Sequence, residues 1–505
     1  MNTDEYLFLG FIAIPILFLL LKIKLNKNKS GLRSHPIVGT LPDFIKNKHR
    51  LLEWTTEILS SATPAQTMVL HVPIIQTVQI LTSNPLNVEH ILKTNSKNYP
   101  KGELNHFKVR DFLGDGIFNS DGENWHFQRK MASLEFNKRS LRNFIMEIVR
   151  FQILHRLIPV LDAAVEKGTI LDLQDVLQRF AFDNICKLAF NVDTGENILR
   201  DFMKAFDESA EIVTERFLNP VVFIWRLKRF LNIGTEKRLK ESMKIVDAFA
   251  YDIIRTRKPN HSDDLLSRFA AATNGDNNNN NNNNTEQFLR DVVINFITAG
   301  RQTTSSGLVW FFWLLSSNPG VELKILEEIK SIKAKHHDDN SSSSIFNFDQ
   351  LREMDYLHAA ISESLRLYPP VYIDTQTAAG DDVMPDGTHV KKGAFVSYCG
   401  YSMGRTESIW GSDCCEFKPE RWLVNGVFKP ESPFKFTAFH AGPRMCLGKE
   451  MSYIQMKSVV VCLLDKFKYV VANKSPPELH LSITLRMKNG LPVQFQNRET
   501  ENLFL

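Results

Sequence analysis

The stretch FTAFHAGPRMCLGKE, residues 436–450, constrains this chain more than any other part of its sequence. It holds five residues at fixed places within ten positions: Phe439, Gly442, Arg444, Cys446 and Gly448. At average residue usage, the odds of a chance match in a 505-residue chain are on the order of 1 in 6,000. A lone cysteine in a glycine-rich turn is usually structural, but a structural cysteine leaves the other four residues unexplained. The pattern therefore predicts a site built around the Cys446 thiolate.

The residues around Cys446 suit a thiolate that is bound to a metal. A helical pattern follows directly, so Cys446 precedes a helix N-terminus, whose partial positive charge stabilises a thiolate. Gly442 and Gly448 let backbone N–H groups approach the sulfur closely. A thiolate can hold a haem iron and donate electron density that favours O–O cleavage. Arg444 would then bind a haem propionate by charge-assisted hydrogen bonds, and Phe439 would shield the thiolate face of the ring from water.

This stretch resembles the haem-binding loop of the cytochromes P-450, and three further patterns test the resemblance. The first is Trp125 with Arg129, four residues apart in a helical segment and therefore on one helix face. An indole N–H and a guanidinium together suit a carboxylate, although such a pair standing alone is more often an ordinary surface pair. The resemblance implies that both residues bind haem propionates. Many relatives also carry a basic residue for a propionate near the place where this chain has Gln376.

The second pattern lies in a long helix predicted over residues 285–317. Its middle contains Ala299 and Gly300, and a glycine in a helix centre costs about 1 kcal/mol. The resemblance implies that these two residues open a groove for dioxygen and that the Thr303 hydroxyl relays protons. The family usually has an acid immediately before this threonine, whereas Gln302 cannot donate an acidic proton. A kinked helix in which Thr303 bonds to its own backbone is the alternative.

The third pattern is Glu363-Ser-Leu-Arg366, on a helix predicted from Tyr356 to Leu367. Charges three residues apart share a helix face and can pair, and most such pairs lie on the surface. The face that carries this pair is otherwise apolar, which favours a buried pair with a third partner, and Arg421 is available as that partner. The resemblance implies that Glu363, Arg366 and Arg421 form a structural triad that fixes the loop presenting the thiolate.

Eight apolar residues are candidates for the substrate pocket. Phe107, Phe112 and Phe118 lie in a predicted loop rich in Gly and Asp, and they are either anchors in the core or an apolar lid over a substrate. The others lie in the long helix, in an extended segment after Pro369-Pro370, and in a C-terminal hairpin that Asn489-Gly490 is predicted to close. These five are Ile297, Val371, Ile373, Ile483 and Leu485.

The first residues of the chain predict a membrane anchor. Residues 6–21 with Ile23 form an apolar run, interrupted by Pro15. At 1.5 Å per residue, a helix of about 18 residues spans about 27 Å, just enough for a bilayer core. Acidic residues precede the run and four lysines follow it, which places the C-terminal side in the cytosol. A cleaved signal peptide is the alternative, but it needs positive charge first and a small-residue cleavage site after the apolar run. We therefore expect a single-pass anchor over residues 1–24 in the endoplasmic reticulum membrane, with a cytosolic catalytic domain.

The composition agrees with one large intracellular enzyme domain. Of the 505 residues 43% are hydrophobic, and the net charge of +4 does not suggest nucleic acid as a partner. The six cysteines show no C-x-x-C spacing, which fits a reducing compartment. Runs of asparagine (residues 277–284) and of His, Asp and Ser (residues 336–344) predict surface loops within the domain. We expect a basic, Pro-rich hinge over residues 25–45 and one haem-thiolate domain over residues 46–505.

The resemblance implies a fold, cofactors and a partner. The fold would be mainly α with smaller β-sheets (α+β), with haem between the long central helix and the Cys446 loop. The cofactor would be haem b (iron protoporphyrin IX), with O2 as co-substrate. Electrons from NADPH would come through a membrane-bound NADPH–cytochrome reductase, because the chain has no flavin or nicotinamide motif. Lys130, Lys138, Arg139 and Lys449 form the expected docking face for it.

Two stretches, WHFQRKMASLEF and FHAGPRMCLGKEMSYIQMKSVV, narrow the resemblance to the plant fatty-acid ω-hydroxylase branch. The expected reaction inserts one oxygen atom from O2 into an unactivated terminal C–H of a lipid-like substrate, a fatty acid first of all. Terminal hydroxylation of a jasmonate–amino acid conjugate or of a sterol side chain is the alternative, which these motifs do not separate. Two further classes stay open: a haem-thiolate isomerase or dehydratase that does not use O2, and a non-catalytic haem- or lipid-binding protein. Gln302, in place of the usual acid, favours an isomerase or dehydratase, whereas the presence of Thr303 argues against one.

Overall fold

The computed structural model describes residues 26–27, 33–34, 39–62, 64–72, 77–134, 142, 144–193, 196–218, 222–256, 264–274, 282–336, 346–473 and 475–498. Its contacts divide the chain into two compact units. Unit 1 is Met1–Pro100 with Ile373–Gly411, and unit 2 is Lys101–Tyr372 with Ser412–Leu505. Helices predominate and the sheets are small, as predicted. The expectation of one domain over residues 46–505 stays a prediction.

Unit 1 contains a four-stranded sheet with the strand order β3-β4-β9-β6. β3 (Thr67–Val72) and β4 (Thr77–Thr82) pair antiparallel, and their β-branched residues favour strands. β9 (Phe395–Tyr398) pairs with β4 in parallel and with β6 (Asp374–Thr377) antiparallel. Ile80 of β4 and its partner Val396 of β9 are fully buried, so the core of this unit lies against the middle of the sheet.

The remaining elements of unit 1 are short. Its helices are α2 (Leu41–Asn47), η1 (Lys48–Arg50), α3 (Leu51–Ser61), α4 (Pro85–Glu89), η3 (His90–Thr94), η4 (Ser96–Asn98), α20 (Gly400–Met403) and α21 (Glu407–Trp410). Its other strands are β1 (Asn26–Lys27), β2 (Arg33–Ser34), β7 (Asp382–Val383) and β8 (His389–Val390). The predicted membrane anchor lies outside the described residues. No helix within the described ranges is both long enough and apolar enough to cross a bilayer.

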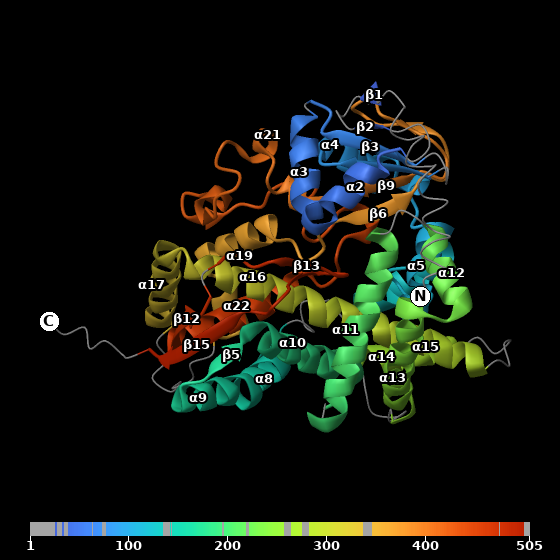
Figure 1. Ribbon diagram of the computed structural model, residues 1–505. Helices are drawn as coiled ribbons and strands as arrows, with labels where there is room; N and C mark the ends of the chain where they lie inside the picture. The colour runs from blue at the N-terminus through green and yellow to red at the C-terminus, as the bar shows by residue number, and fades with distance from the viewer. Residues whose placement is uncertain are drawn as a thin grey trace, which may run out of the picture. The chain divides into compact units, whose positions relative to one another are not determined.

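Unit 2 is built around one long helical run (Figure 1). The run consists of α15 (Asn282–Ile297), a π-helical segment η8 (Thr298–Gln302) and α16 (Thr303–Ser316). This confirms the predicted helix and adds the π segment at its middle. The helix begins at Asn282, so the end of the asparagine run is helical and the expected loop over all of residues 277–284 is wrong there. Apolar residues all round α16 are buried, which makes it a core helix.

Among the helices that contact this central run are α10 (Leu173–Phe190), α11 (Glu196–Leu218), α19 (Asp355–Leu367) and α22 (Lys449–Lys466). Two of these helices, α19 and α22, approach α16 closely at Gly307. A Cβ on Gly307 would lie 3.1 Å from Leu365 Cδ2 of α19 and 3.2 Å from Met456 Sδ of α22. The lack of a side chain there lets α19 and α22 pack against the run, and α22 is the helix that follows the predicted thiolate.

The other elements of unit 2 surround this centre. Its helices are α5 (Glu103–Leu113), α6 (Gly122–Ser133), η6 (Phe144–Val149), α8 (Arg150–Gln152), η7 (Ile153–Leu157), α9 (Ile158–Lys167), α12 (Val222–Leu231), α13 (Gly234–Thr256), α14 (Leu265–Asn274), α17 (Pro319–Lys335), α18 (Phe348–Arg352), η9 (Pro419–Trp422) and η10 (Gly442–Arg444). Its strands are β5 (Ile170–Asp172), β10 (Leu423–Val424), β11 (Val427–Phe428), β12 (Phe467–Val471), β13 (Leu479–Leu481), β14 (Leu485–Met487) and β15 (Pro492–Asn497).

The C-terminal strands correct one prediction. Asn489-Gly490 was expected to close a hairpin, but the strands on either side of it do not pair with each other. β14 pairs with β13, whereas β15 pairs with β12 and β5. Gly490 has φ 67°, and a Cβ there would lie 2.1 Å from a carboxylate oxygen of Asp172. The turn therefore carries the chain from one sheet to another, and the hairpin is closed earlier, at the turn that holds Ile483.

Candidate active site

The predicted thiolate lies at the end of a loop that leads into α22. Gly442 has φ 65°, a conformation that glycine adopts readily and other residues rarely. The Cys446 backbone N–H donates to the Phe439 carbonyl oxygen over 2.9 Å and so closes the loop. Gly448 caps the N-terminus of α22, which places the thiol beside the positive end of that helix. The loop thus has the form that the motif predicts.

Burial and the polar groups around the sulfur act on its ionisation in opposite directions, and the net effect is a raised pKa. Burial is the largest influence on the pKa of the Cys446 thiol and raises it, whereas the Gly448 N–H, Arg129 and Lys449 each lower it. Cys446 is nevertheless an exposed residue. An accessible sulfur with a backbone donor and two nearby cations is the donor set that a metal-bound thiolate requires, so these residues fit a haem iron.

Two arginines meet beside this loop, together with Trp125 of α6. The Arg444 Nη2 donates to the Asp121 carboxylate over 2.6 Å, and its guanidinium lies 4.6 Å from the centre of the Trp125 ring. The Arg129 Nη2 donates to the Met445 carbonyl oxygen over 2.5 Å. Trp125, Arg129 and Arg444 are thus brought together around the loop. Their binding of propionates stays a prediction, and no sequence pattern indicated Asp121 as the partner of Arg444.

The central helical run has an accessible strip at its π-helical segment. Ala299, Gly300 and Thr303 are partly exposed, although the residues on either side of them in the helix are mostly buried. The Thr303 hydroxyl donates to the Ala299 carbonyl oxygen over 2.5 Å, which leaves its oxygen lone pairs free to accept. Thr304 Oγ1 lies 3.4 Å from Ser452 Oγ of α22, so this part of the run lies against the helix that follows Cys446.

Gly300 has a packing role that the motif did not indicate. A Cβ on Gly300 would lie 2.5 Å from Ile185 Cγ1 of α10, closer than real side chains approach. The glycine therefore allows α10 to pack tightly against the π-helical segment. The groove for dioxygen at Ala299 and Gly300 stays a prediction. Gln302 is buried and donates from Nε2 to Asp207 of α11 over 3.3 Å, a contact between residues far apart in the sequence.

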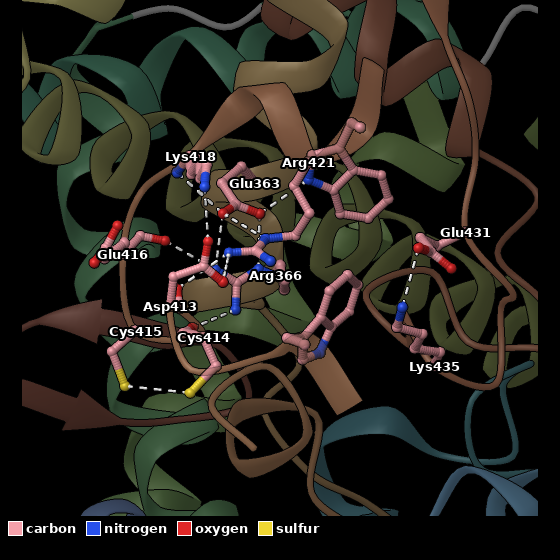
Figure 2. Close-up of polar contacts among 12 residues, drawn as sticks. Glu363, Arg366, Asp413, Cys414, Cys415, Glu416, Lys418, Arg421, Glu431 and Lys435 are labelled. Carbon is pink, nitrogen blue, oxygen red and sulfur yellow. Dashed lines mark hydrogen bonds and ion pairs between the residues drawn. The ribbon is translucent and has the colours of Figure 1, made fainter. Parts of the chain in front are cut away.

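Glu363, Arg366 and Arg421 lie together, as Figure 2 shows. The Glu363 carboxylate accepts from Arg366 Nε over 2.7 Å and from Arg421 Nε over 3.3 Å. Trp422 Nε1 donates to the same carboxylate over 2.9 Å. Arg366 also donates to the Cys414 carbonyl oxygen over 2.6 Å, so the group ties α19 to the segment that leads toward the Cys446 loop. Sequence reasoning missed the backbone acceptor and the indole.

The candidate pocket residues lie in different environments. Phe107 and Phe112 are on helix α5 rather than in the predicted loop. Phe112 is fully buried and packs on Phe206 with ring centres 4.9 Å apart, so the core interpretation holds for it. Ile297 and Leu485 are also fully buried. The partly or clearly exposed candidates are Phe107, Phe118, Val371, Ile483 and, in unit 1, Ile373.

Gln376, which stands where many relatives carry a basic residue, lies in unit 1. Its Nε2 donates to the Asp374 carboxylate over 2.8 Å.

Comparison with known proteins identifies the family. The chain matches the family model described as Cytochrome P450 over residues 30–493. It is 47% identical over 470 residues to Cytochrome P450 CYP94D108 of Paris polyphylla, covering 91% of each chain. It is 45% identical to Cytochrome P450 94B1 of Arabidopsis thaliana, with 92% of this chain and 91% of that relative covered. It is 43% identical to Cytochrome P450 94A1 of Vicia sativa, with 93% of this chain and 91% of that relative covered. The protein therefore belongs to the cytochrome P450 family and is a monooxygenase of that family.

Proposed function

We propose that this cytochrome P450 hydroxylates an unactivated terminal C–H of a lipid-like substrate, and that the substrate is a fatty acid oxidised at its ω carbon. The observation that carries the proposal is the accessible Cys446 thiol, with the Gly448 N–H, Arg129 and Lys449 around it. The stretches around Trp125 and Cys446 resemble the plant fatty-acid ω-hydroxylase branch, which supports the substrate class. Relatives in the 94 series agree with this branch.

The protein supplies binding and orientation, and the cofactor supplies the oxygen chemistry. Cytochromes P450 use haem b, O2 and electrons from NADPH through a reductase. Cys446 is the residue that would ligate the iron, and Trp125, Arg129 and Arg444 would bind the propionates. Thr303 would hold a proton-donating hydrogen-bond network at the accessible strip of the helical run. Arg444 could bind a propionate only if the propionate shared or replaced the contact between Arg444 and Asp121.

Partners and location follow from the same proposal. A single-pass anchor over residues 1–24 would hold the enzyme in the endoplasmic reticulum membrane, where lipid substrates and the reductase are present. The exposed Lys130 on α6 and the partly exposed Lys449 at the start of α22 would contribute to a basic docking face for the reductase. Lys138 and Arg139, the other members of the expected face, lie outside the described residues. Reversing the charge of Lys130 should raise the reductase concentration needed for half-maximal turnover.

The decisive experiment is product analysis by mass spectrometry. Microsomes that carry the full chain and a plant reductase are given medium and long fatty acids, jasmonoyl-isoleucine, cholesterol and a side-chain-hydroxylated sterol. We expect one oxygen atom on the terminal carbon of a fatty acid, with NADPH and O2 consumed. Terminal hydroxylation confined to the sterols or to the jasmonate conjugate would replace the fatty acid as substrate. Turnover of a lipid without NADPH and O2 would contradict a monooxygenase reaction.

A further inference from the structure

A buried polar cluster lies behind the π-helical segment of the central run. Asp207 of α11 is at its centre, with its two carboxylate oxygens 2.5 Å and 3.0 Å from the two terminal nitrogens of Arg301. Arg486 Nη1 of β14 lies 3.2 Å from Oδ2 of the same carboxylate. The Gln302 Nε2 donates to Oδ1 over 3.3 Å. One carboxylate on α11 therefore holds the residue that stands immediately before Thr303.

The cluster joins a solvent-accessible carboxylate to a buried acceptor that lacks a partner. The Asp207 side chain is 19% exposed, so solvent reaches it. Gln302 is 1% exposed, and its Oε1 has no hydrogen-bond partner among the described residues. A buried amide oxygen that is left unpaired costs about 1–3 kcal/mol. Such an atom is usually satisfied by an ordered water, which makes two to four hydrogen bonds.

We propose that Asp207 is a positioning residue for proton delivery in this enzyme. Its carboxylate fixes the Gln302 amide so that Oε1 holds one ordered water beside Thr303, and it takes up protons from solvent for that water. The carboxylate that residue 302 does not provide is thus supplied by α11. This inference rests on the proposed hydroxylase function, because only a reaction that consumes protons at this helix needs the path.

The reaction requires two protons in each cycle. A substrate RH and O2, with two electrons from the reductase and two protons, give ROH and one molecule of water. The O–O and C–H bonds break, and both protons taken from solvent end in the water that leaves. Burial by itself would raise the pKa of Asp207, but Arg301, Arg486 and Gln302 together lower it. Asp175 adds a further negative charge near the cluster. Asp207 is therefore ionised at rest, so it accepts the Gln302 hydrogen bond as a carboxylate.

The test compares Asp207→Asn with Glu211→Gln. Asn keeps the shape of the side chain and removes the carboxylate that holds Gln302. Glu211 lies one turn further along α11, pairs with His480 over 3.0 Å and lies 3.8 Å from Arg486 Nη1, so it is a carboxylate that shares one neighbour with Asp207 but has no contact to Gln302. A third protein, Asp207→Asn with Gln302→Asp, returns a carboxylate to residue 302. Each holoenzyme is measured for product formed per NADPH, hydrogen peroxide released and the solvent deuterium isotope effect.

We expect product per NADPH to fall roughly fivefold to tenfold in Asp207→Asn, with more peroxide and a larger solvent isotope effect. This is less than the typical 10²–10⁴-fold effect of general acid–base groups, because bulk water replaces part of the path. Glu211→Gln should match the unmodified enzyme, and the double variant should regain at least half of the lost coupling. If the Asp207–Arg301 ion pair is purely structural, its loss in Asp207→Asn would lower haem content and thermal stability. It would not change how electrons divide between product and peroxide. Unchanged coupling in Asp207→Asn would overturn the inference.

A crystal structure of the unmodified enzyme gives a readout that is independent of turnover. We expect density for a water within about 3.2 Å of Gln302 Oε1, and its loss or displacement in Asp207→Asn. Absence of this water in the unmodified enzyme would overturn the inference. If no variant hydroxylates any lipid, the proposed function has failed, and the crystallographic water still decides whether Asp207 positions Gln302.

Discussion

The Glu363 carboxylate accepts hydrogen bonds from two nitrogens of Arg366, 2.7 Å from Nε and 2.8 Å from Nη2, and both side chains are almost inaccessible. An ion pair in such a place is stable only while it is complete, because a charge left alone in the interior keeps its desolvation penalty. The pair also anchors the segment around Cys414 and Arg421, which leads toward the cofactor loop. Its integrity should therefore matter for both folding and haem retention.

Glu363→Gln should lower the free energy of unfolding by about 3–5 kcal/mol, because Arg366 is left buried without its counter-ion. Chemical denaturation measures the change, and the haem-to-protein ratio after purification should fall with it. Glu431→Gln is the matched control, since Glu431 pairs with Lys435 over 3.0 Å at a partly exposed site. An exposed pair is worth about 0–1 kcal/mol. Similar losses in the two variants would show that the burial of the triad does not matter.

Cys446→Ala should bind haem poorly and form no hydroxylated product, because the only thiol of this loop is lost. The carbon monoxide difference spectrum of the reduced protein measures thiolate ligation directly. Cys415→Ala is the control, since Cys415 is the other exposed cysteine among the described residues. It should leave the spectrum and activity unchanged. A Cys446→Ala protein that still turned over substrate would remove the thiolate from the mechanism.

Gly300→Ala should destabilise the protein through a clash with Ile185, whose Cγ1 would lie 2.5 Å from the new Cβ. Overpacking typically costs about 1–3 kcal/mol, and the better helix propensity of Ala offsets about 1 kcal/mol of that. We expect a net loss of about 0–2 kcal/mol in thermal or chemical unfolding. Combining Gly300→Ala with Ile185→Ala should cost less than the sum of the two changes. Gly320→Ala, where a Cβ would meet nothing within 4 Å, should be neutral or stabilising.

Acid should destabilise the protein through His358. This imidazole is stacked on Tyr453 with ring centres 4.0 Å apart, and burial, with Lys457 and Lys449, lowers its pKa to about 2. In the unfolded chain the group titrates near its ordinary pKa of about 6.5, so below that pH the unfolded state binds a proton that the folded state does not. The free energy of unfolding should therefore fall as the pH drops below about 6.5, by up to about 1.4 kcal/mol per pH unit.

His358→Phe keeps an aromatic ring against Tyr453 and removes the titration. Denaturation curves between pH 7 and pH 5 should then show a shallower loss of stability than those of the unmodified protein. His389→Phe, at an exposed position of β8, is the control and should leave the slope unchanged. Equal slopes for His358→Phe and the unmodified protein would assign the acid sensitivity to other groups.

Much of the site was predictable because its signals are local in the sequence. The residue types and spacings around Cys446, the Trp125–Arg129 pair and the Glu363–Arg366 pair each fit within one loop or one helix. The long central helix was predicted from its pattern and its end before Asn318-Pro319. Such features follow from backbone geometry over a few residues, which the sequence specifies directly.

The tertiary structure decided which distant residues meet. Asp121 pairs with Arg444 across 323 positions of the chain, and Asp207 reaches Gln302 across 95. No period or motif marks such contacts, because they depend on how whole helices pack. For the same reason, Asn489-Gly490 looked like a hairpin turn, although β14 and β15 join different sheets. The sequence by itself determined the family and the local elements, whereas packing alone determined the partners of their side chains.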